Sequence, residues 1–248
     1  MITMQKNRPV VLSIAGFDPC GGAGVLADAK TFEMLDVQGM AVITANTIQT
    51  EDSFSHIDWM DIDVVCRSIR VLMSRYEINI FKIGIVKDVA FLNTIVQCVK
   101  TQNENAFIIW DPVIKSSSGF RFLDENNWHL LSSVLDVVNL VTPNYDECQI
   151  LKPYLENNKS VAVLIKGGHR MDAVGVDVLQ IGNSTVRFDP VMQTVCPKHG
   201  SGCILSSSIA AHIALGESLE NACLQAKRYV ETYLNSHSSL LGYHHYAE

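Results

Sequence analysis

The chain has 248 residues, of which 48% are hydrophobic and 18% are charged, and its formal net charge is −7 at pH 7. This length fits a single α/β domain over residues 1–248, with enough apolar residues to fill a sizeable core. The negative charge argues against a nucleic acid as the main partner, because phosphate backbones are bound by clustered Lys and Arg. A small anionic ligand is still compatible with it, since local backbone dipoles can outweigh the global charge.

The seven cysteines are scattered along the chain, and no two of them form a CxxC pair. An odd count without paired spacing favours a reducing compartment over a disulfide framework or a zinc knuckle. The N-terminal stretch MITMQKNRPVVLSIAG holds only a short apolar segment and no cleavage site, and no apolar run is long enough to cross a bilayer. We therefore expect a cytoplasmic protein without a membrane partner.

Strands and helices alternate in the first half of the chain. Apolar, β-rich runs that end at glycine or at polar residues predict buried strands, and apolar residues at helical spacing predict amphipathic helices. In chain order, we expect a strand at 10–16, a helix at 25–36, a strand at 40–49, a helix at 61–76, a strand at 78–86, a helix at 89–99 and a strand at 106–111.

The second half continues the alternation and closes with two helices. We expect a helix at 127–135, a strand at 137–144, a helix at 146–153 that ends at Pro153, a strand at 160–168, a hairpin of 174–182 with 184–189, and helices at 202–215 and 219–234. Strands that alternate with helices predict right-handed βαβ units and a mostly parallel sheet with helices on both faces.

Polar residues follow the ends of the predicted strands. In parallel α/β sheets, ligands bind beyond the carboxyl ends of the strands. One edge of the sheet should therefore collect polar side chains from several loops: Asp18, Gln49, Asp111, Lys115, Asn144, Glu147, Lys166, His169 and Cys203.

The stretch HGSGC, residues 199–203, joins a glycine-rich turn to the start of a predicted helix. Successive amides converge in such a turn and the helix dipole adds positive potential, so Gly200, Ser201 and Gly202 predict an anion hole. Cys203 falls in the first helical turn, where we expect its thiol pKa to lie below the free value. The alternative is a small-residue turn before a buried helix, with Cys203 as filler.

Other loops offer groups that suit a nucleotide and a metal. Asn144 and Glu147 could together reach the water shell of Mg²⁺, or could simply be a helix N-cap and a solvated acid. Asp111 is a second candidate acid or a turn former before Pro112, and Lys166 could neutralise phosphate oxygens or be merely solvated. The chain has no Walker A motif and no protein-kinase signature, so a phosphotransferase would need another way to hold its nucleotide.

Seven motifs, taken in chain order, resemble those of the hydroxymethylpyrimidine/phosphomethylpyrimidine kinases, which are ribokinase-like enzymes of thiamine biosynthesis. They are AGFDPCGGAGVLADAKTF, VITANTIQ, KIGIV, DPVIKSSSG, TPNYDE, KGGH and HGSGC. The resemblance covers residues 10 to about 234. It implies a ribokinase-like three-layer sandwich and ATP-dependent phosphorylation of 4-amino-5-hydroxymethyl-2-methylpyrimidine and of its monophosphate. It also implies Mg²⁺ as cofactor and a homodimer.

The same resemblance implies site residues by position. Cys203 stands where relatives place the catalytic base, with the amides of Gly200, Ser201 and Gly202 as the anion hole and Lys166 near the phosphates. The pyrimidine pocket would be formed by Gly16, Ala23, Asp28, Gln49, Ile85 and Val113. ATP and its phosphates would be bound by Asp111, Asn144, Glu147, Lys166 and His199, with Glu147 and Asp111 serving Mg²⁺ through water.

Three details depart from the family pattern. One is the short stretch 151–169, LKPYLENNKSVAVLIKGGH, which leaves little room between the helix of Glu147 and the next strand and predicts that a peripheral helix is trimmed. Pro197 and Lys198 replace the usual Asn-Thr before His199, so Lys198 would either contact a phosphate or disturb the nucleotide edge, and Cys20 replaces the usual serine.

The segment 113–122 is expected to act as a mobile flap. The histidines of the C-terminal tail suggest either a metal cluster or, as we expect, a solvated tail: His237, His244 and His245.

Two other functions stay open. The first is a pyridoxal kinase of the same superfamily, although the serines at 116–118 leave the flap without a cysteine that could form a hemithioacetal with an aldehyde, which favours the pyrimidine. The second is a catalytically silent ligand-binding protein, which the unusual Pro197-Lys198 pair keeps possible.

Overall fold

The computed structural model describes residues 7–115, 120, 122–123, 127–169, 174–192 and 196–245. Its strands are β1 (Val10–Phe17), β2 (Gln38–Gln49), β3 (Phe54–Trp59), β4 (Ile78–Ile83), β5 (Phe107–Trp110), β6 (Leu140–Val141), β7 (Ala162–Ile165), β8 (Asp177–Ile181) and β9 (Ser184–Phe188). Its α-helices are α1 (Gly24–Met34), α2 (Ile62–Arg75), α3 (Val89–Gln102), α4 (Leu131–Leu135), α5 (Tyr145–Leu155), α6 (Ser201–Ala214) and α7 (Leu219–Leu234).

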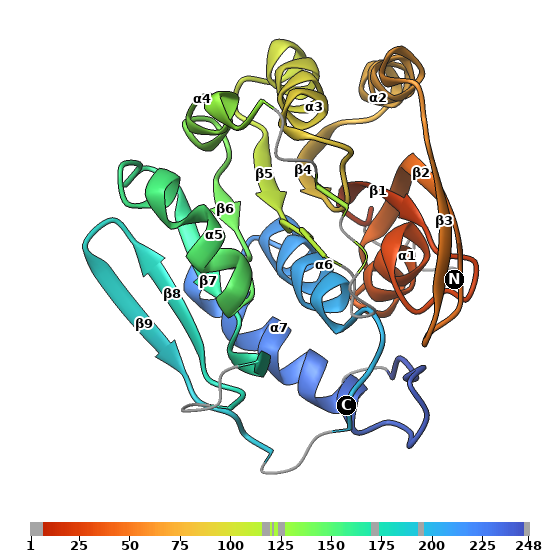
Figure 1. The fold of residues 1–248 in the computed structure, drawn as a ribbon, viewed down its shortest axis with the longest axis vertical. Helices are drawn as coiled ribbons and strands as arrows, with labels where there is room; N and C mark the ends of the chain where they lie inside the picture. Colours follow the sequence, from red (N-terminus) through yellow and green to blue (C-terminus); the bar gives the residue numbers. More distant parts are fainter. Residues whose placement is uncertain are drawn as a thin grey trace, which may run out of the picture.

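Within the described residues, the nine strands form one sheet in the order β3-β2-β1-β4-β5-β6-β7-β8-β9 (Figure 1). Six adjacent strands are parallel to one another, in the order β2, β1, β4, β5, β6 and β7. β3 pairs antiparallel with β2, β8 with β7, and β9 with β8. The chain builds outward from β1 to β2 and then returns to place β4 on the other side of β1. This reversal creates a switch point between β1 and β4, which is where open α/β sheets bind ligands.

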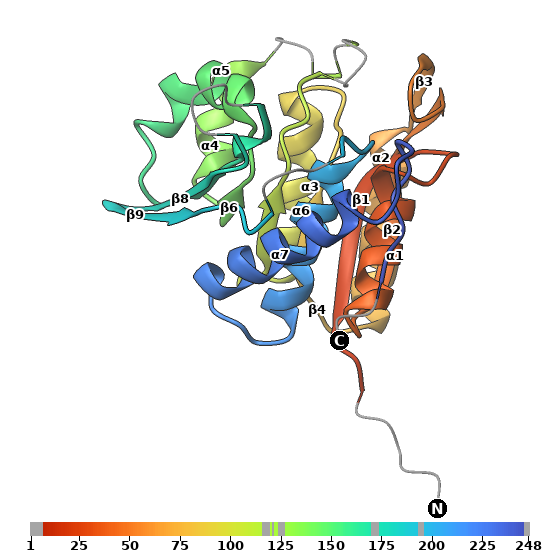
Figure 2. The same ribbon diagram turned by 90° about the horizontal axis from the view of Figure 1, so that it is seen from below.

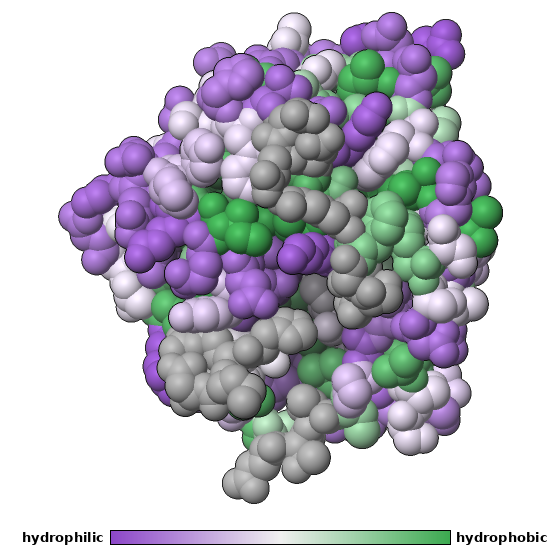
Figure 3. Space-filling model, in the orientation of Figure 1, coloured by the Kyte–Doolittle hydropathy of each residue, from purple (hydrophilic) through white to green (hydrophobic). Residues whose placement is uncertain are grey.

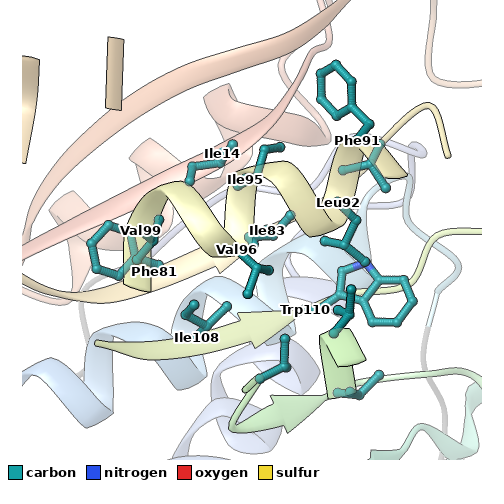
Figure 4. Close-up of a cluster of buried hydrophobic side chains, with 14 of the residues drawn as sticks. Ile14, Phe81, Ile83, Phe91, Leu92, Ile95, Val96, Val99, Ile108 and Trp110 are labelled. Carbon is teal, nitrogen blue, oxygen red and sulfur yellow. The ribbon is translucent and has the colours of Figure 1, made fainter. Parts of the chain in front are cut away.

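Helices cover both faces of the sheet and make three layers, as Figures 1 and 2 show. One core packs α2, α3, α4 and α5 against one face, and a second core packs α1, α6 and α7 against the other. Figure 4 shows the first core, where side chains of α3 meet Trp110 of β5 and Phe81 of β4. The predicted three-layer sandwich with a mostly parallel central sheet is confirmed.

The element predictions need four corrections. β3 was not predicted, and it extends the sheet as an edge strand with only partly buried side chains. The strand expected at 137–144 shrinks to β6, and the helix expected at 127–135 begins with a 3₁₀ turn. Helix α5 continues past Pro153 to Leu155 because the proline lies in its last turn, so that only the exposed Gln149 carbonyl loses its helical partner.

No helix among the described residues combines the length and the apolar character that a membrane crossing needs. Figure 3 shows hydrophobic and hydrophilic residues side by side near the centre of the face seen in Figure 1.

Candidate active site

A cavity of about 230 Å³ lies at the carboxyl ends of the parallel strands. Of the nine polar residues expected at this edge, eight line it, and the structure does not describe the side chain of the ninth, His169. The cavity therefore collects groups from the end of β2, from the loops after β1, β4, β5, β6 and β7, and from the start of α6. Parallel strands end at one edge, so residues far apart in sequence converge there.

Two glycine-rich loops pack against each other at one wall of this cavity. Gly200 has a left-handed φ of +74°, and a Cβ there would overlap the carbonyl oxygen of Gly22. Gly24 has φ of +59°, and its Cβ would overlap the carbonyl oxygen of Gly16. Glycine is required at both positions. A side chain at Gly200 would push the two loops apart, and one at Gly24 would push the start of α1 away from the end of β1.

The second loop forms the start of α6, with Gly200 as N-cap and no side-chain hydrogen bond at the cap. Among the described residues, no acceptor is found for the amides of Ser201, Gly202 and Cys203. These are the free N–H groups that every helix start carries, and they face the cavity. The predicted anion hole is therefore geometrically formed, while its role stays a prediction.

Cys203 lines the cavity next to these amides. Burial raises its thiol pKa above the ordinary value, and the carboxylates of Asp28 and Asp111 add to this effect against the opposing charge of Lys82. The expected lowering of this pKa is therefore wrong. Desolvation of a thiolate outweighs the field of one helix terminus, and Cys203 rests as a neutral thiol at neutral pH.

Lys166 and Asp111 form an ion pair beside the anion hole, with Nζ 2.7 Å from Oδ1. A Cβ added at Gly202 would lie 3.2 Å from the Lys166 Nζ, so the ammonium is adjacent to the backbone of the hole. Burial alone would lower the pKa of Lys166, but Asp111 and Glu147 outweigh it and leave this pKa raised. The lysine therefore stays charged, which suits it to bind a phosphate.

Asn144 and Glu147 form a capping box at the start of α5. The Asn144 side chain accepts from the Glu147 amide at 2.9 Å, and Glu147 Oε2 accepts from the Asn144 amide at 2.8 Å. The N-cap reading is thus confirmed, but Glu147 is only 5% exposed and lines the cavity, so it is not a solvated acid. Burial raises its pKa, and the nearby Asp111 adds to the shift.

Most of the residues expected to bind the pyrimidine line the cavity: Gly16, Ala23, Gln49, Ile85 and Val113. Asp28 does not. It is fully buried, where it accepts hydrogen bonds from Ser13 and Lys82. The carboxylate of Asp28 is therefore a support below the site rather than a part of its wall.

Lys82 is the site-related residue that the sequence reasoning missed. Its side chain has 0% exposure and lies 2.8 Å from Asp28, and a Cβ at Gly84, a residue of the cavity wall, would lie 3.3 Å from its Nζ. Burial by itself lowers the pKa of Lys82, but the nearby carboxylates, Asp28 above all, outweigh it and leave this pKa raised. The signal was present, since a lysine inside the apolar strand INIFKI has to find a buried partner.

Lys198 also lines the cavity, but it does not fill it. Its Nζ donates to the carbonyl of His237, and the His199 amide donates to the carbonyl of Leu240 at 2.9 Å. The C-terminal tail is therefore fastened to the loop that precedes the anion hole. His244 accordingly packs against Tyr229 and Tyr233, and burial lowers its pKa to about 4, so the prediction of a solvated tail is wrong for this residue.

The base of the expected flap is described only in part, and residues 116–119 and 121 lie outside the described residues. Phe122 lines the cavity, and its amide donates to the Ile114 carbonyl at 2.9 Å. Its ring contacts Phe54 of β3 at a centroid distance of 5.2 Å. The unpredicted strand β3 therefore supports this wall of the site.

A second cavity of about 250 Å³ adjoins the first on the other side of the anion hole. The two cavities share Lys166, Gly168, Ser201 and Gly202. The second one is also lined by apolar side chains of the loop before β8, the loop after β9, and helices α6 and α7: Val174, Pro190, Met192, Leu205, Val230 and Leu234. Three charged side chains complete its lining: Asp177, Lys227 and Glu231.

The chain resembles known proteins in sequence and in fold. The family model described as phosphomethylpyrimidine kinase matches residues 18–247. The hydroxymethylpyrimidine/phosphomethylpyrimidine kinase of Aquifex aeolicus is 34% identical over 94% of this chain and 98% of its own. A phosphomethylpyrimidine kinase structure from Clostridium difficile is 28% identical over 90% and 98% of the chains, with a TM-score of 0.74. The fold also matches a pyridoxal kinase of Staphylococcus aureus in complex with ADP, at 24% identity over 93% and 89% of the chains and a TM-score of 0.81.

Proposed function

The chain belongs to the phosphomethylpyrimidine kinase family, and we propose that it transfers the γ-phosphoryl group of ATP to 4-amino-5-hydroxymethyl-2-methylpyrimidine and then to the monophosphate. One observation carries this proposal: free helix-start amides, a charged lysine and a thiol border a cavity that Gln49 also lines. The family is one of vitamin kinases that bind ATP, and the pyrimidine as the specific substrate is our proposal.

Gln49 gives the pyrimidine ring a matched partner. A 4-aminopyrimidine places a donor amine next to an acceptor ring nitrogen, and a carboxamide presents an acceptor and a donor in the same plane. Ile85 and Val113 line the same cavity and suit the faces of the ring. The hydroxymethyl group would then extend toward Cys203 and the anion hole.

In the transfer step, the hydroxymethyl oxygen forms the new bond to the γ-phosphorus, and the bond from that phosphorus to the bridging oxygen of ADP breaks. Cys203 orients the hydroxyl group, and the thiolate form of Cys203, which is the minor form at neutral pH, takes the hydroxyl proton late in the reaction. A base that is only weakly populated suits this step, because a loose transition state needs little deprotonation of the attacking oxygen at its start. The amides of residues 201–203 and the ammonium of Lys166 stabilise the transferred group.

Whether Mg²⁺ fits this site depends on the side chains that could hold it. Asp111 and Glu147 are buried carboxylates at the cavity, but Asp111 already pairs with Lys166, and Glu147 accepts from the amides of Asn144 and Ile114. Such a pair fits a hydrated Mg²⁺ held mainly by phosphate oxygens and water. When bound, the ion would neutralise charge on the phosphates.

The second cavity is our proposed site for the nucleoside of ATP. It is mostly apolar, it is of a size for a flat base, and it meets the first cavity at Lys166 and Gly202. A nucleotide that lies across this junction would present its terminal phosphate to the anion hole, in line with an alcohol in the first cavity. The homodimer stays a prediction, which light scattering of the purified protein tests.

The experiment that tests this function compares two alcohols under equal Mg-ATP. Release of ADP is measured with the hydroxymethylpyrimidine and with pyridoxal, and we expect a higher kcat/KM for the pyrimidine. Gln49→Met removes both hydrogen bonds and should lower kcat/KM for the pyrimidine by about 10- to 100-fold. Gln97→Met, on an exposed position of α3, is the matched control.

The other outcomes of this experiment each favour one of the two alternative functions. A clear preference for pyridoxal would replace the pyrimidine as substrate. ADP release with neither alcohol, from a folded protein, would favour the catalytically silent binding protein instead.

A further inference from the structure

Three side chains with metal-binding atoms converge at the rim of the first cavity. The Cys20 Sγ lies 3.1 Å from Asp18 Oδ1, and the His199 Nε2 lies 3.0 Å from Asp18 Oδ2. One atom from each residue can be chosen so that all three atoms lie within 4.8 Å of one another. Among the described residues, this is the one group of three or more His, Cys, Asp and Glu side chains so close together.

We propose that Asp18, Cys20 and His199 bind Zn²⁺, with the fourth coordination position open to the substrate cavity. The proposed transfer step gives Asp18 and Cys20 no role, and His199 enters it only as an expected contact of the ATP phosphates. Carboxylate, thiolate and imidazole are the ligands of Zn²⁺, and three protein ligands with one open position are the arrangement of exchangeable zinc sites. The thiolate also discriminates against Mg²⁺, which prefers oxygen ligands.

The fold holds these ligands in place through contacts that a metal would leave intact. The Asp18 carboxylate accepts from the amides of Cys20 and Ala23 at 3.0 and 2.8 Å, which fixes its orientation. A Cβ at Gly22 would lie 2.7 Å from the His199 ring, so the glycine makes room for the imidazole. The His199 amide is itself fixed by the Leu240 carbonyl. The ligands thus need little rearrangement to bind an ion.

Charge and protons balance in this step. Zn²⁺ would replace the proton that Cys20 now shares with Asp18 and would release it to solvent. One thiolate and one carboxylate then neutralise the dication. The proton that His199 Nε2 now directs at Asp18 moves to Nδ1, so that the neutral imidazole can donate its Nε2 lone pair. The bound ion would replace the direct Asp18–His199 hydrogen bond as the link between the two loops.

The location gives the site a consequence for activity. Asp18 and His199 both line the cavity, and His199 precedes the anion hole directly. An ion there would occupy the rim of the substrate cavity and hold the loop of the hole in one position, so we expect Zn²⁺ to inhibit the kinase. This consequence rests on the proposed function, whereas metal binding itself does not.

Co²⁺ serves as the spectroscopic probe on the full-length protein. Titration should produce the near-ultraviolet absorption of a thiolate–cobalt bond, and added Zn²⁺ should abolish it. In Cys20→Ser the band should be absent and the affinity for Zn²⁺, measured by calorimetry, should fall by at least about tenfold, since even the loss of a second-shell partner costs about that much. Cys98→Ser, a half-buried cysteine of α3, is the matched control that should keep the band.

Kinase assays with Mg-ATP then test the consequence. We expect Zn²⁺ to inhibit the natural protein and to inhibit Cys20→Ser at least about tenfold less strongly, in proportion to its weaker binding. A thiolate–cobalt band that persists in Cys20→Ser, or that is missing in the natural protein, overturns the proposal. If the band behaves as expected but no alcohol is phosphorylated, the zinc site stands and the proposed function fails.

Discussion

The side chains of Lys166 and Asp111 form an ion pair of 2.7 Å although 55 residues separate them in the sequence. They follow β7 and β5, and the parallel sheet brings these strand ends to one edge. Asp111 is 1% exposed and also accepts from Thr142 at 3.2 Å. Burial by itself would raise the pKa of Asp111, but Lys166 and Lys82 outweigh it and keep this pKa low. The aspartate thus holds the ammonium next to the anion hole.

Lys166→Met should abolish most of the activity. It removes the cation beside Gly202, and the loss of one such group in a preorganised site typically costs about 10² to 10³ in kcat. It also leaves Asp111 buried without its partner, which should lower the free energy of unfolding by about 3–5 kcal/mol. Steady-state kinetics and urea unfolding measure the two effects. Lys152→Met, on an exposed lysine of α5, should change neither.

Cys203→Ala should lower kcat by about 10²-fold or more while the KM for the alcohol changes little, because the thiol acts on the proton rather than on the ring. In the natural protein, the thiolate fraction grows as the pH rises, and burial places the thiol pKa above the ordinary value. We therefore expect kcat to keep increasing through the pH at which a free thiol titrates. A kcat that is flat over this range, or unchanged in Cys203→Ala, removes the cysteine from the mechanism.

Removing one partner of the buried pair of Lys82 and Asp28 should destabilise the protein, whereas replacing both partners by apolar residues should be tolerated. Lys82→Met alone leaves a carboxylate at 0% exposure without its cation and should cost about 3–5 kcal/mol of stability. Lys82→Met combined with Asp28→Leu should recover most of this loss in thermal and urea unfolding.

The double variant removes both the charge of Lys82, which lowers the Cys203 pKa, and that of Asp28, which raises it. It should still have a modestly reduced kcat, because the effect of Lys82 is the larger of the two. A folded double variant with full activity would show that this pair serves only the core.

Gly200→Ala should disrupt the site much more than a left-handed glycine elsewhere. Both Gly200 and Gly216 have positive φ, but a Cβ at Gly200 would overlap the Gly22 carbonyl, whereas one at Gly216 has nothing within 4 Å. Gly216→Ala should therefore cost only about 1–2 kcal/mol of backbone strain and keep kcat. Gly200→Ala should lose activity and more stability, and equal losses in the two variants would show that the packing of the two loops is unimportant.

The sequence by itself determined the layers of the fold and the polar edge of its sheet. Periodicity is local, so α2 and α7 could be located within one or two residues of their observed bounds. The polar residues that follow each strand can be recognised in the sequence, and parallel connections bring the ends of these strands to one edge of the sheet. Glycines in HGSGC could likewise be assigned to a tight turn before a helix.

Only the tertiary structure decided the electrostatics and the partners. The direction of the Cys203 pKa shift depends on burial and on charges at Asp28, Lys82 and Asp111, which lie far away in the sequence. The pairing of Asp18 with His199 spans 181 residues, and the edge strand β3 is fixed by its neighbour β2 rather than by its own pattern. Desolvation and Coulomb energies sum over all groups that are near in space, and a sequence lists only which groups are near along the chain.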